Sequence, residues 1–494
     1  MSNRPETNKQ SCPVYKKCGG CQLQNLSYPE QLEFKQKKVE KLLKRFCTVE
    51  KIIGMKTPYH YRNKVQAAFY TDKKGKIISG VYQSGSHHVV GIDSCQTEDV
   101  IADKIIVAVR KLLPSFRMTT YNEDTGKGFL RHILVKRGFA TNQIMLVLVT
   151  GTPVFPSKNN FVKAILKQFP EITTIVQNIN PYRTNLVLGD NQKVLYGKGY
   201  IEDILCGCRF RISPKSFYQI NPVQTEVLYG KAIEFANLKG NETVLDTYCG
   251  IGTIGIIAAK NGAGNVIGAE LNGDAVRDAI VNARANNLKN IRFYKVDAGE
   301  FMREAADEDE KPDVVFMDPP RAGSDRKFLD SLIKMSPKKV VYVSCNPETL
   351  ARDLAYLTQN SPYKAQKIQP VDMFPHTAHI ETVVLLSHKK PDGHINVKVE
   401  FGEGEGKVPL DNIAKRVESY KPKERVTYKM IKEYIEAKYG FKVHTAYIAE
   451  VKRDLGLPMY DAPNAAEGLK QTRKHPTQEK VNAIKDALNY YNLI

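Results

Sequence analysis

Apolar and polar residues alternate in two different ways along the chain, and the pattern changes near Asn237. Before this point, stretches such as 59–70 and 76–90 alternate residue by residue, which is typical of strands in a half-buried sheet. After it, short apolar runs such as Val314–Met317 and Val340–Val343 are separated by helical patterns. Strands of this kind are buried on both faces, so the second part of the chain is predicted to form a parallel sheet covered by helices.

Helical periodicity marks two further parts of the chain. Residues 28–45 predict a basic amphipathic helix ahead of the first strands. A glycine-rich run at 402–406 is followed by four shorter helical patterns within 411–491, and the middle two, separated by Gly440–Val443, resemble a helix-turn-helix pair. Nucleic-acid binding and protein docking both fit such a tail, and the pattern leaves the two open.

The length of 494 residues predicts three or four domains at roughly 100–200 residues each. We expect four segments, each with its own pattern: a cysteine-bearing arm with a β-rich part (1–100), a mixed α+β region suited to RNA binding (101–236), a doubly wound α/β domain (237–388) and a helical extension (389–494).

The charge balance indicates a polyanionic partner. Lysine and arginine number 73 against 53 acidic residues, a formal charge of +20, and nucleic acid is the first candidate for such a partner. A merely basic protein without a polyanionic partner is the alternative. No apolar run approaches the roughly 20 residues that span a bilayer, and the first ten residues are polar, so we expect a cytoplasmic protein without a membrane partner.

Cysteine spacing indicates a metal site in the arm. Nine cysteines in a reducing compartment favour metal binding or catalysis over disulfides. Cys12, Cys18 and Cys21 lie close together with two glycines between the last two, and Cys95, in a polar loop, is the best fourth ligand. Four thiolates suit zinc or a four-iron four-sulfur cluster, and the spacing does not choose between them. Reduced structural thiols are the alternative.

Two buried strands of the α/β domain run directly into polar turns. Asp318-Pro-Pro-Arg follows the first strand, and Ser344-Cys345-Asn-Pro follows the second. The carboxyl ends of parallel strands form the ligand-binding edge of such a sheet, so a thiol at Cys345 is placed to react. Glu381 leads directly into the last predicted strand of the domain, Thr382–Leu386, and is expected at the same edge. A buried cysteine that merely ends its strand is the alternative.

A glycine-rich turn indicates a nucleotide-like cofactor. Tyr248–Gly255 contains G-x-G-x-x-G after a strand that ends at Asp246, and these glycines allow a cofactor to approach a helix N-terminus. Glu270 ends the next strand, where a carboxylate can accept both hydroxyls of a ribose. Dehydrogenases share this pattern, but Asp246 before the glycines and the Asp-Pro-Pro turn fit S-adenosylmethionine better.

Two places in the middle region carry candidate RNA contacts. Arg131 stands at a strand start, where its guanidinium group could reach phosphate or base, and a surface salt bridge is the alternative. Phe217 and Gln219 lie in a loop rich in aromatic and amide residues, and have the side chains needed to stack on a base and to hydrogen-bond its edge. An ordinary linker is the alternative for this loop.

Taken together, these motifs resemble the RNA uridine-C5 methyltransferases, and most closely the ribosomal RNA enzymes that carry an iron–sulfur cluster. The resemblance spans Cys12 to about His388 and includes the four arm cysteines and five motifs: Ser216–Asn221, Asp246–Gly250, Asp318–Gly323, Ser344–Pro347 and His379–Thr382. Many of these relatives begin with a small β-barrel that binds RNA, whereas 11 residues precede the first ligand cysteine here, so RNA capture is expected elsewhere.

The resemblance implies a Rossmann-like class I methyltransferase domain at 237–388 and a role for each candidate residue. Cys12, Cys18, Cys21 and Cys95 would hold a four-iron four-sulfur cluster. The methyl donor would be contacted by Gln219, Tyr248, Thr253, Glu270, Asp297 and Asp318. Cys345 would be the nucleophile and Glu381 the base, while Phe217 and Arg131 would hold the target base.

The expected reaction is S-adenosylmethionine-dependent methylation of a uridine at C5 in 23S ribosomal RNA, by a monomer, through a covalent bond between Cys345 and C6. The cluster is expected to be structural, because no redox step enters this chemistry. Three alternatives stay open: the same reaction on transfer RNA, an RNA-binding iron–sulfur protein without catalysis, and methylation of an amino group, which needs no thiol.

Overall fold

The computed structural model of the chain describes residues 12–83, 86, 88–184, 186–308, 311–388, 428–455 and 477–490. These residues belong to two compact units, 1–398 and 399–494. The predicted glycine-rich run at 402–406 and the helical pattern at 411–418 lie outside the described residues.

The second unit contains three described helices that share one apolar core. They are α12 (Tyr428–Tyr439), α13 (Thr445–Asp454) and α14 (Gln478–Tyr490). Ile435 of α12, Ile448 of α13 and Ile484 of α14 are fully buried against one another in this core. The helices therefore lie where their apolar periodicity predicts them, with Gly440 in the left-handed conformation that ends α12.

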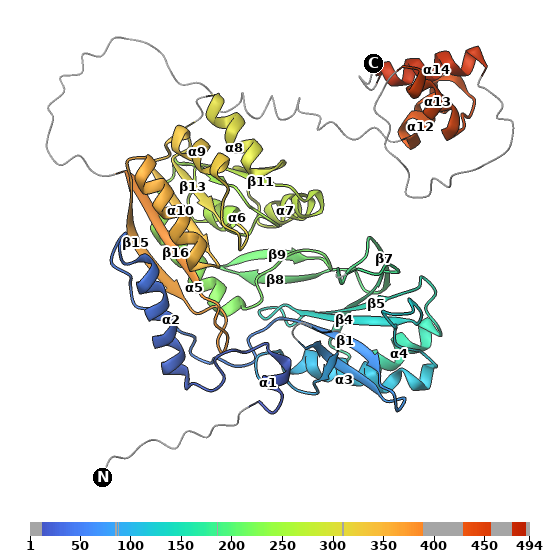
Figure 1. Cartoon of the computed structure of the whole chain (residues 1–494), viewed down its shortest axis with the longest axis horizontal. Helices are drawn as coiled ribbons and strands as arrows, with labels where there is room; N and C mark the ends of the chain where they lie inside the picture. The colour runs from blue at the N-terminus through green and yellow to red at the C-terminus, as the bar shows by residue number, and fades with distance from the viewer. Residues whose placement is uncertain are drawn as a thin grey trace. The chain divides into compact units, whose positions relative to one another are not determined.

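The first unit begins with a seven-stranded sheet in the order β3-β2-β1-β4-β5-β6-β7 (Figure 1). Its strands, in chain order, are β1 (Lys64–Thr71), β2 (Ile77–Tyr82), β3 (Val89–Gly91), β4 (Leu130–Arg137), β5 (Ile144–Thr150), β6 (Ile172–Ile179) and β7 (Asn191–Tyr196). Helices α3 (Val100–Leu112) and α4 (Lys158–Gln168) bury their apolar faces against one side of it. Because β1 pairs with β4, a single sheet crosses the predicted boundary between 100 and 101, which is not a structural division.

The second sheet has the order β12-β11-β10-β13-β14-β16-β15. Its strands are β10 (Thr243–Asp246), β11 (Asn265–Glu270), β12 (Ile291–Lys295), β13 (Val314–Met317), β14 (Lys339–Ser344), β15 (Tyr363–Val371) and β16 (Glu381–His388). Strands β10 to β14 are parallel, and β16 runs antiparallel to β14. The predicted doubly wound sheet is thus present, and its strand order reverses between β10 and β13, where such folds bind ligands.

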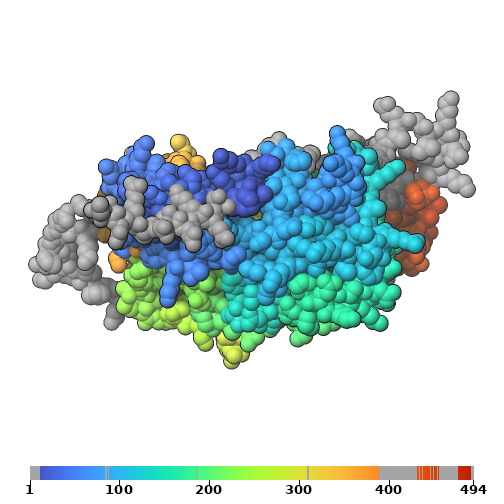
Figure 2. Space-filling view, turned by 90° about the horizontal axis from the view of Figure 1, so that it is seen from below, coloured from blue at the N-terminus to red at the C-terminus, as the bar shows by residue number. Residues whose placement is uncertain are grey.

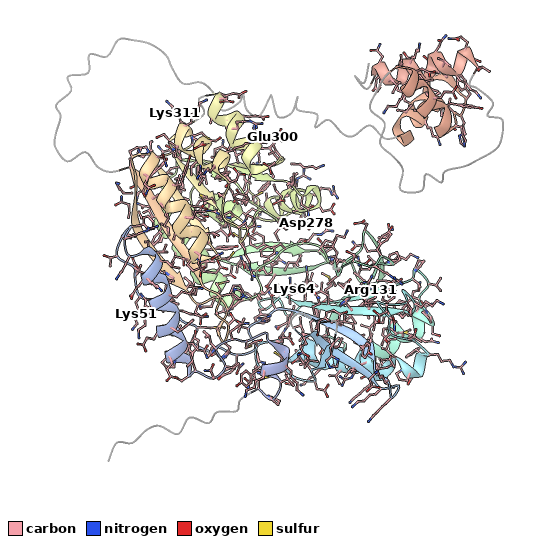
Figure 3. The ribbon with its side chains drawn as sticks, viewed as in Figure 1. Lys51, Lys64, Arg131, Asp278, Glu300 and Lys311 are labelled. Carbon is pink, nitrogen blue, oxygen red and sulfur yellow. The ribbon has the colours of Figure 1, made fainter. Side chains whose placement is uncertain are left out.

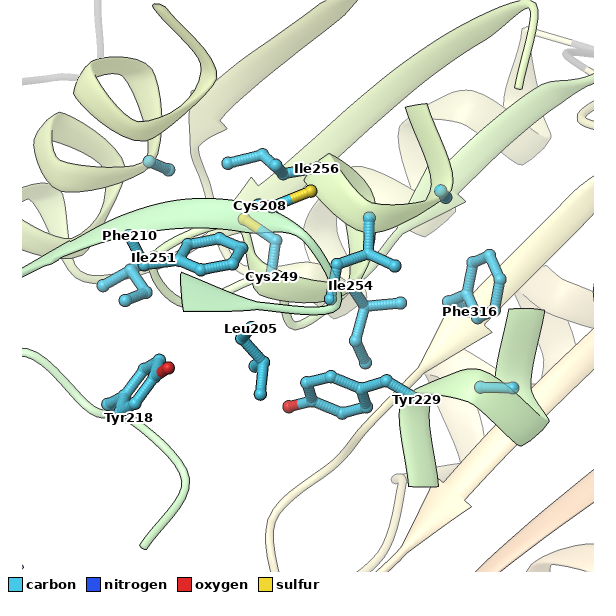
Figure 4. Packing of buried hydrophobic residues seen from close by; sticks show 14 of the residues in the cluster. Leu205, Cys208, Phe210, Tyr218, Tyr229, Cys249, Ile251, Ile254, Ile256 and Phe316 are labelled. Atoms are coloured by element: carbon cyan, nitrogen blue, oxygen red, sulfur yellow. The ribbon is translucent and has the colours of Figure 1, made fainter. Parts of the chain in front are cut away.

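Helices separate these strands, as the sequence predicts. They are α5 (Pro222–Ala236), α6 (Thr253–Lys260), α7 (Gly273–Ala285), α8 (Ala298–Asp307), α9 (Arg326–Met335) and α10 (Pro347–Asn360). A hairpin of β8 (Ile201–Leu205) and β9 (Cys208–Ile212) lies between the two sheets (Figure 1). Its Leu205 and Phe210 pack with Tyr218, Tyr229 and Ile254 in one continuous core (Figure 4). The predicted boundary at 236/237 is therefore bridged by this core.

The N-terminal arm is bound firmly to the second sheet. It contains the short α1 (Tyr15–Cys18) and α2 (Tyr28–Leu43), and α2 lies beside β15 and α10 (Figure 1). Lys35 of α2 and Asp372 after β15 form an ion pair of 2.6 Å in which both side chains are fully buried. Figure 2 shows the dark-blue arm beside the light-blue residues of the first sheet. None of the helices described is long and apolar enough to cross a bilayer.

Candidate active site

Cys345 and Glu381 lie at one edge of the second sheet, on neighbouring strands. Strand β14 ends at Ser344 and β16 begins at Glu381, and the antiparallel register places Ser344 opposite Thr382. Burial raises the pKa of the Cys345 thiol to about 11, and the carboxyl groups of Glu381 and Asp318 add to this shift. The three side chains therefore share one site, to which Asp318 comes from the turn after β13.

The burial of the site raises the pKa of both acids, Glu381 and Asp318. Burial raises the pKa of Glu381 well above its ordinary value, and the Asp318 carboxyl raises it further, while the Arg321 guanidinium opposes the shift. Burial alone raises the pKa of Asp318 to about 7. The site thus holds exchangeable protons near neutral pH, which suits acid–base chemistry.

The Asp-Pro-Pro-Arg turn is fixed by α10. Asp353 accepts hydrogen bonds from the Ser324 N–H at 2.9 Å and the Tyr342 hydroxyl at 2.7 Å. Asn346 donates to the carbonyl of Arg321 at 3.1 Å. Gly323 has a φ of +75° and lies so close to Asp353 that a Cβ atom would clash with its carboxyl group. Asp318 and Arg321 are therefore set in place before a substrate arrives.

The loop that leads into Glu381 is held by the N-terminal arm. His376 accepts a hydrogen bond at its carbonyl from the Leu23 N–H, and donates its own N–H to Gln31, both at 2.9 Å. Lys35 donates to the carbonyl of Phe374 at 3.0 Å. His376 has a φ of +69°, an uncommon conformation for a residue other than glycine, which these contacts maintain. Sequence reasoning missed this support, because Gln31 and Lys35 lie about 340 residues away from the loop.

Two carboxyl groups, those of Asp246 and Glu270, lie at the ends of β10 and β11 beside the switch point of the sheet. Asp246 accepts a hydrogen bond from the Gly255 N–H at 2.8 Å, and its other carboxyl oxygen is buried without a partner. Burial raises the pKa of Asp246 to about 7. Glu270 accepts hydrogen bonds from the N–H groups of Gly250 and Asn272, at 3.1 and 2.7 Å. The unpartnered oxygen of Asp246 can take part in one more hydrogen bond, which fits a cofactor bound at this place.

Tyr229 connects two of the predicted donor contacts and was missed by the sequence analysis. Its buried hydroxyl hydrogen-bonds with Thr253 and Gln219, and lies near the carboxyl groups of Asp318 and Asp246. The signal for it was weak, since a tyrosine in the helical run 225–236 is usually a core residue. The remaining two predicted contacts lie nearby in the fold, with Tyr248 packed against Phe328 and Asp297 capping α8.

Phe217 is displayed on a loop that is anchored on both sides. Its side chain is 64% exposed. The fully buried Lys136 donates to the carbonyls of Ser213 and Ser216, at 2.9 and 2.8 Å, and the Ser216 hydroxyl donates to Asp278 at 2.6 Å. Burial lowers the pKa of Lys136 to about 7. An exposed aromatic ring on a fixed loop is well suited to stack on an unpaired base.

Comparisons with known proteins agree with this geometry. The family model described as tRNA (Uracil-5-)-methyltransferase matches residues 163–389. An uncharacterized RNA methyltransferase of Bacillus cereus is 44% identical over 388 residues, covering 78% of this chain and 84% of its own length. One of Listeria monocytogenes is 46% identical over 379 residues, covering 76% and 83%. This chain belongs to the tRNA (uracil-5-)-methyltransferase family.

A solved member of the same fold supports the assignment. The Pyrococcus abyssi tRNA (uracil-54, C5)-methyltransferase, solved in complex with S-adenosyl-L-homocysteine, is 30% identical, with a TM-score of 0.63 over 74% of this chain and 85% of its own. The predicted family resemblance is confirmed, as is the Rossmann-like α/β methyltransferase fold. The chain is therefore an RNA methyltransferase.

Arg131 does not have the role that the family resemblance implies. Its side chain is buried, and all five N–H groups are engaged within the protein. Glu123 accepts three of these hydrogen bonds, at 2.9 to 3.2 Å, and the carbonyls of Asn180 and Tyr182 accept the others, at 2.8 and 2.6 Å. The guanidinium group also stacks on Tyr121, with 4.5 Å to the ring centre. The alternative of a salt bridge was correct, although the bridge is buried rather than at the surface.

The four predicted ligand cysteines lie in one region of the described structure but are not arranged as a metal site. Burial raises the pKa of Cys18 and Cys21, and the other arm thiols raise it further. The carboxyl group of Glu98 acts on both Cys18 and Cys95, so the fourth cysteine lies near the other three. Within the described ranges, however, no group of three or more His, Cys, Asp or Glu side chains could hold a metal ion. The structure therefore does not support the predicted ligand set as a preformed metal centre.

Proposed function

We propose that this enzyme transfers a methyl group from S-adenosylmethionine to C5 of a uridine in 23S ribosomal RNA, through a covalent bond between Cys345 and C6. The observation that supports the proposal most is the pairing of Cys345 and Glu381 on adjacent strands, within the electrostatic reach of each other and of Asp318. Methylation of an amino group would need no thiol at this place.

Uracil C5 is a poor nucleophile, so the ring must first become electron-rich. In the proposed reaction the Cys345 thiol gives its proton to a neighbouring carboxylate, and the sulfur forms a bond to C6 while the C5–C6 double bond shifts to an enolate. C5 then forms a bond to the methyl group, whose bond to the sulfonium breaks and leaves its electron pair on the donor's sulfur as a neutral thioether. Glu381 removes the C5 proton, the sulfur–C6 bond breaks as the C5–C6 double bond reforms, and Cys345 is regenerated with one net proton released.

The methyl donor would supply an electrophilic methyl group, which it carries on a positively charged sulfur. The residues that would hold it are Gln219, Tyr248, Thr253, Glu270, Asp297 and Asp318, and the free oxygen of Asp246 gives room for one more hydrogen bond. A positive charge near Asp318 lowers the pKa of carboxyl groups in the site, which prepares Glu381 to accept a proton.

Phe217 and Gln219 would hold the target base after it leaves its stack. Removal of a base from a stack costs a few kcal/mol, which aromatic stacking and edge hydrogen bonds in the pocket offset. Phe217 is exposed and its loop is fixed, while Gln219 reaches the hydroxyl of Tyr229. The two residues thus connect the RNA side of the site with the donor side.

The iron–sulfur cluster belongs to this proposal as a structural group of the arm. Its four ligands would be the thiolates of Cys12, Cys18, Cys21 and Cys95, the ligand type that such a cluster takes. Arg62 lies near Cys18 and Cys21, and its Nε atom is buried without a partner, so a negatively charged cluster would complete its interactions. Iron and sulfide analysis of anaerobically purified protein tests this; a Cys18→Ser variant is expected to lose both, and a Cys47→Ser variant to keep them.

The decisive test of the reaction uses Cys345→Ala with Cys47→Ala as its matched control. We expect Cys345→Ala to form no 5-methyluridine on 23S ribosomal RNA from cells lacking the gene, and Cys47→Ala to form normal amounts. RNA carrying 5-fluorouridine should form a covalent complex with the unmodified enzyme and with Cys47→Ala, but not with Cys345→Ala. Undiminished methylation by Cys345→Ala would refute the covalent role.

The same reaction on transfer RNA is the second candidate, favoured by the substrate named for the Pyrococcus abyssi enzyme. Mapping of 5-methyluridine in total RNA, from cells with and without the gene, separates the two. A site that disappears from 23S ribosomal RNA supports the first candidate, and one that disappears from transfer RNA supports the second. An RNA-binding protein without catalysis would change neither.

A further inference from the structure

The segment between β6 and β7 carries exposed apolar side chains on a backbone that several hydrogen bonds hold in place. Tyr182 is 66% exposed and Leu186 is 72% exposed. We call residues 180–184 and 186–190 the Tyr182 loop. Exposed apolar side chains on a soluble protein are common singly, but here two of them stand on a loop that several buried polar groups support.

The support comes from three buried polar residues. Asn180 donates to the carbonyl of Leu186 at 2.7 Å, and accepts from the Tyr182 N–H at 3.3 Å. Asn178 exchanges two hydrogen bonds with Gly189, at 2.9 and 2.7 Å. Arg131, as described above, donates to the carbonyls of Asn180 and Tyr182. A buried polar group without a hydrogen-bond partner destabilises the fold. These side chains and the backbone of the loop therefore hold each other in place through their hydrogen bonds.

The Tyr182 loop continues the surface that carries Phe217. Lys215 of the Phe217 loop forms an ion pair of 3.1 Å with Asp190 of the Tyr182 loop. The two loops are anchored at opposite ends of β4, at Lys136 and at Arg131, which are five residues and so about 17 Å apart. Figure 3 shows Arg131 and Lys64, which pairs with Lys136 in the β1–β4 ladder, separated along this sheet. This span corresponds to about five stacked nucleotides at roughly 3.4 Å each.

We infer that the Tyr182 loop is a second RNA-binding site, in which Tyr182 stacks on an unpaired base that flanks the target uridine and Leu186 contacts its edge. Unpaired RNA is the occupant that the observations favour. Exposed aromatic rings stack on bases without regard to sequence, and the chain carries a formal charge of +20. A prearranged loop loses little freedom on binding, which is what the buried polar supports provide. The inference rests on the proposed function, and deepens it by naming a subsite.

The first test measures binding at fixed salt with an oligouridine single strand, and with the same strand annealed to oligoadenosine. We expect Tyr182→Ala to raise the Kd for the single strand about tenfold, and Tyr182→Phe to stay within about twofold of the unmodified enzyme, because the ring is kept. The control Phe34→Ala removes another exposed ring, 44% exposed on α2, and should change neither Kd. Binding of the duplex should not respond to Tyr182→Ala, since its bases are already stacked.

The second test uses the absence of tryptophan from this chain. Tyr182→Trp introduces a single indole, whose fluorescence should be quenched by the single strand and not by the duplex, whereas Phe34→Trp should respond to neither. No quenching at position 182, or equal losses of single-strand and duplex affinity in Tyr182→Ala, would overturn the inference. Failure of the proposed function would show differently, as unmodified enzyme that binds RNA but makes no 5-methyluridine.

Discussion

Replacing Lys35 with methionine tests whether the arm holds the active-site loop. The Lys35–Asp372 ion pair is fully buried at 2.6 Å, and the same ammonium group donates to the carbonyl of Phe374 at 3.0 Å. Asp372 would keep one side-chain donor, the Tyr28 hydroxyl at 2.9 Å. Methionine has a similar length and fills the space, so the change removes the charge and the hydrogen bonds with little loss of packing.

The expected loss follows from these contacts. Removing one partner of a buried ion pair costs about 3–5 kcal/mol, because the other charge stays buried and unpaired. The hydrogen bond that Tyr28 still donates to Asp372 reduces this cost by roughly 1 kcal/mol. The loss of the hydrogen bond to Phe374 increases it by about the same amount. We therefore expect Lys35→Met to lower the free energy of unfolding by about 4 kcal/mol, and to slow methyl transfer, since the loop after Phe374 leads into Glu381.

Urea unfolding followed by far-ultraviolet circular dichroism measures the first effect, and the rate of 5-methyluridine formation measures the second. The matched control is Lys38→Met on the same helix. Its ion pair with Glu348 is 2.9 Å long but partly exposed, and such pairs contribute about 0–1 kcal/mol. Adding Asp372→Leu to Lys35→Met should restore part of the stability. Equal, small losses for both lysines would refute the reasoning.

Three further predictions follow from the site. Glu381→Gln should still bond to C6 but release product at least roughly a hundredfold more slowly, so a denaturation-resistant enzyme–RNA complex should accumulate on gels. In the free enzyme, alkylation of Cys345 by iodoacetamide, followed by peptide mass spectrometry, should rise about tenfold per pH unit between about pH 7 and about pH 9. The thiolate is the reactive form, and the pKa of the thiol, about 11, lies above this pH range, so the reactive fraction should rise with pH throughout it. An alkylation rate that does not change with pH would contradict that pKa. Arg131→Lys should lower the free energy of unfolding by about 2–4 kcal/mol in urea titrations, whereas Arg209→Lys, in an exposed pair, should change it by less than about 1 kcal/mol.

The sequence predicts best what depends on local pattern. Continuous apolar runs identify β13 and β14, and the polar turns after them place Asp318 and Cys345 at one sheet edge. Glu381 was placed there because it leads directly into a predicted strand, although the antiparallel direction of β16 is not evident from its residues. The position of a motif that follows a parallel strand can be predicted directly, because the carboxyl ends of these strands all lie on the ligand-binding side of the sheet.

Long-range pairing limits the rest. Arg131 was correctly placed at a strand start, but the carbonyl of Asn180 that receives its hydrogen bond comes from a strand end 49 residues later. Lys35 looks like one of many lysines on a basic helix until the fold brings Asp372 beside it. The pairing of β1 with β4 likewise crosses the predicted boundary between 100 and 101. None of these partners is marked by spacing or periodicity.

The junction of β14 and β16 fixes the spacing of Cys345 and Glu381 independently of the loops that are proposed to contact RNA. The distance between the sulfur and the carboxyl group is set by a ladder of backbone hydrogen bonds, and a shift of one residue would turn every side chain of β16 to the other face of the sheet. Phe217 and Tyr182, the residues proposed to contact RNA, stand by contrast on loops held by Lys136 and Arg131 of the other sheet. New targets can therefore be acquired by loop substitutions, while the reacting atoms keep their spacing.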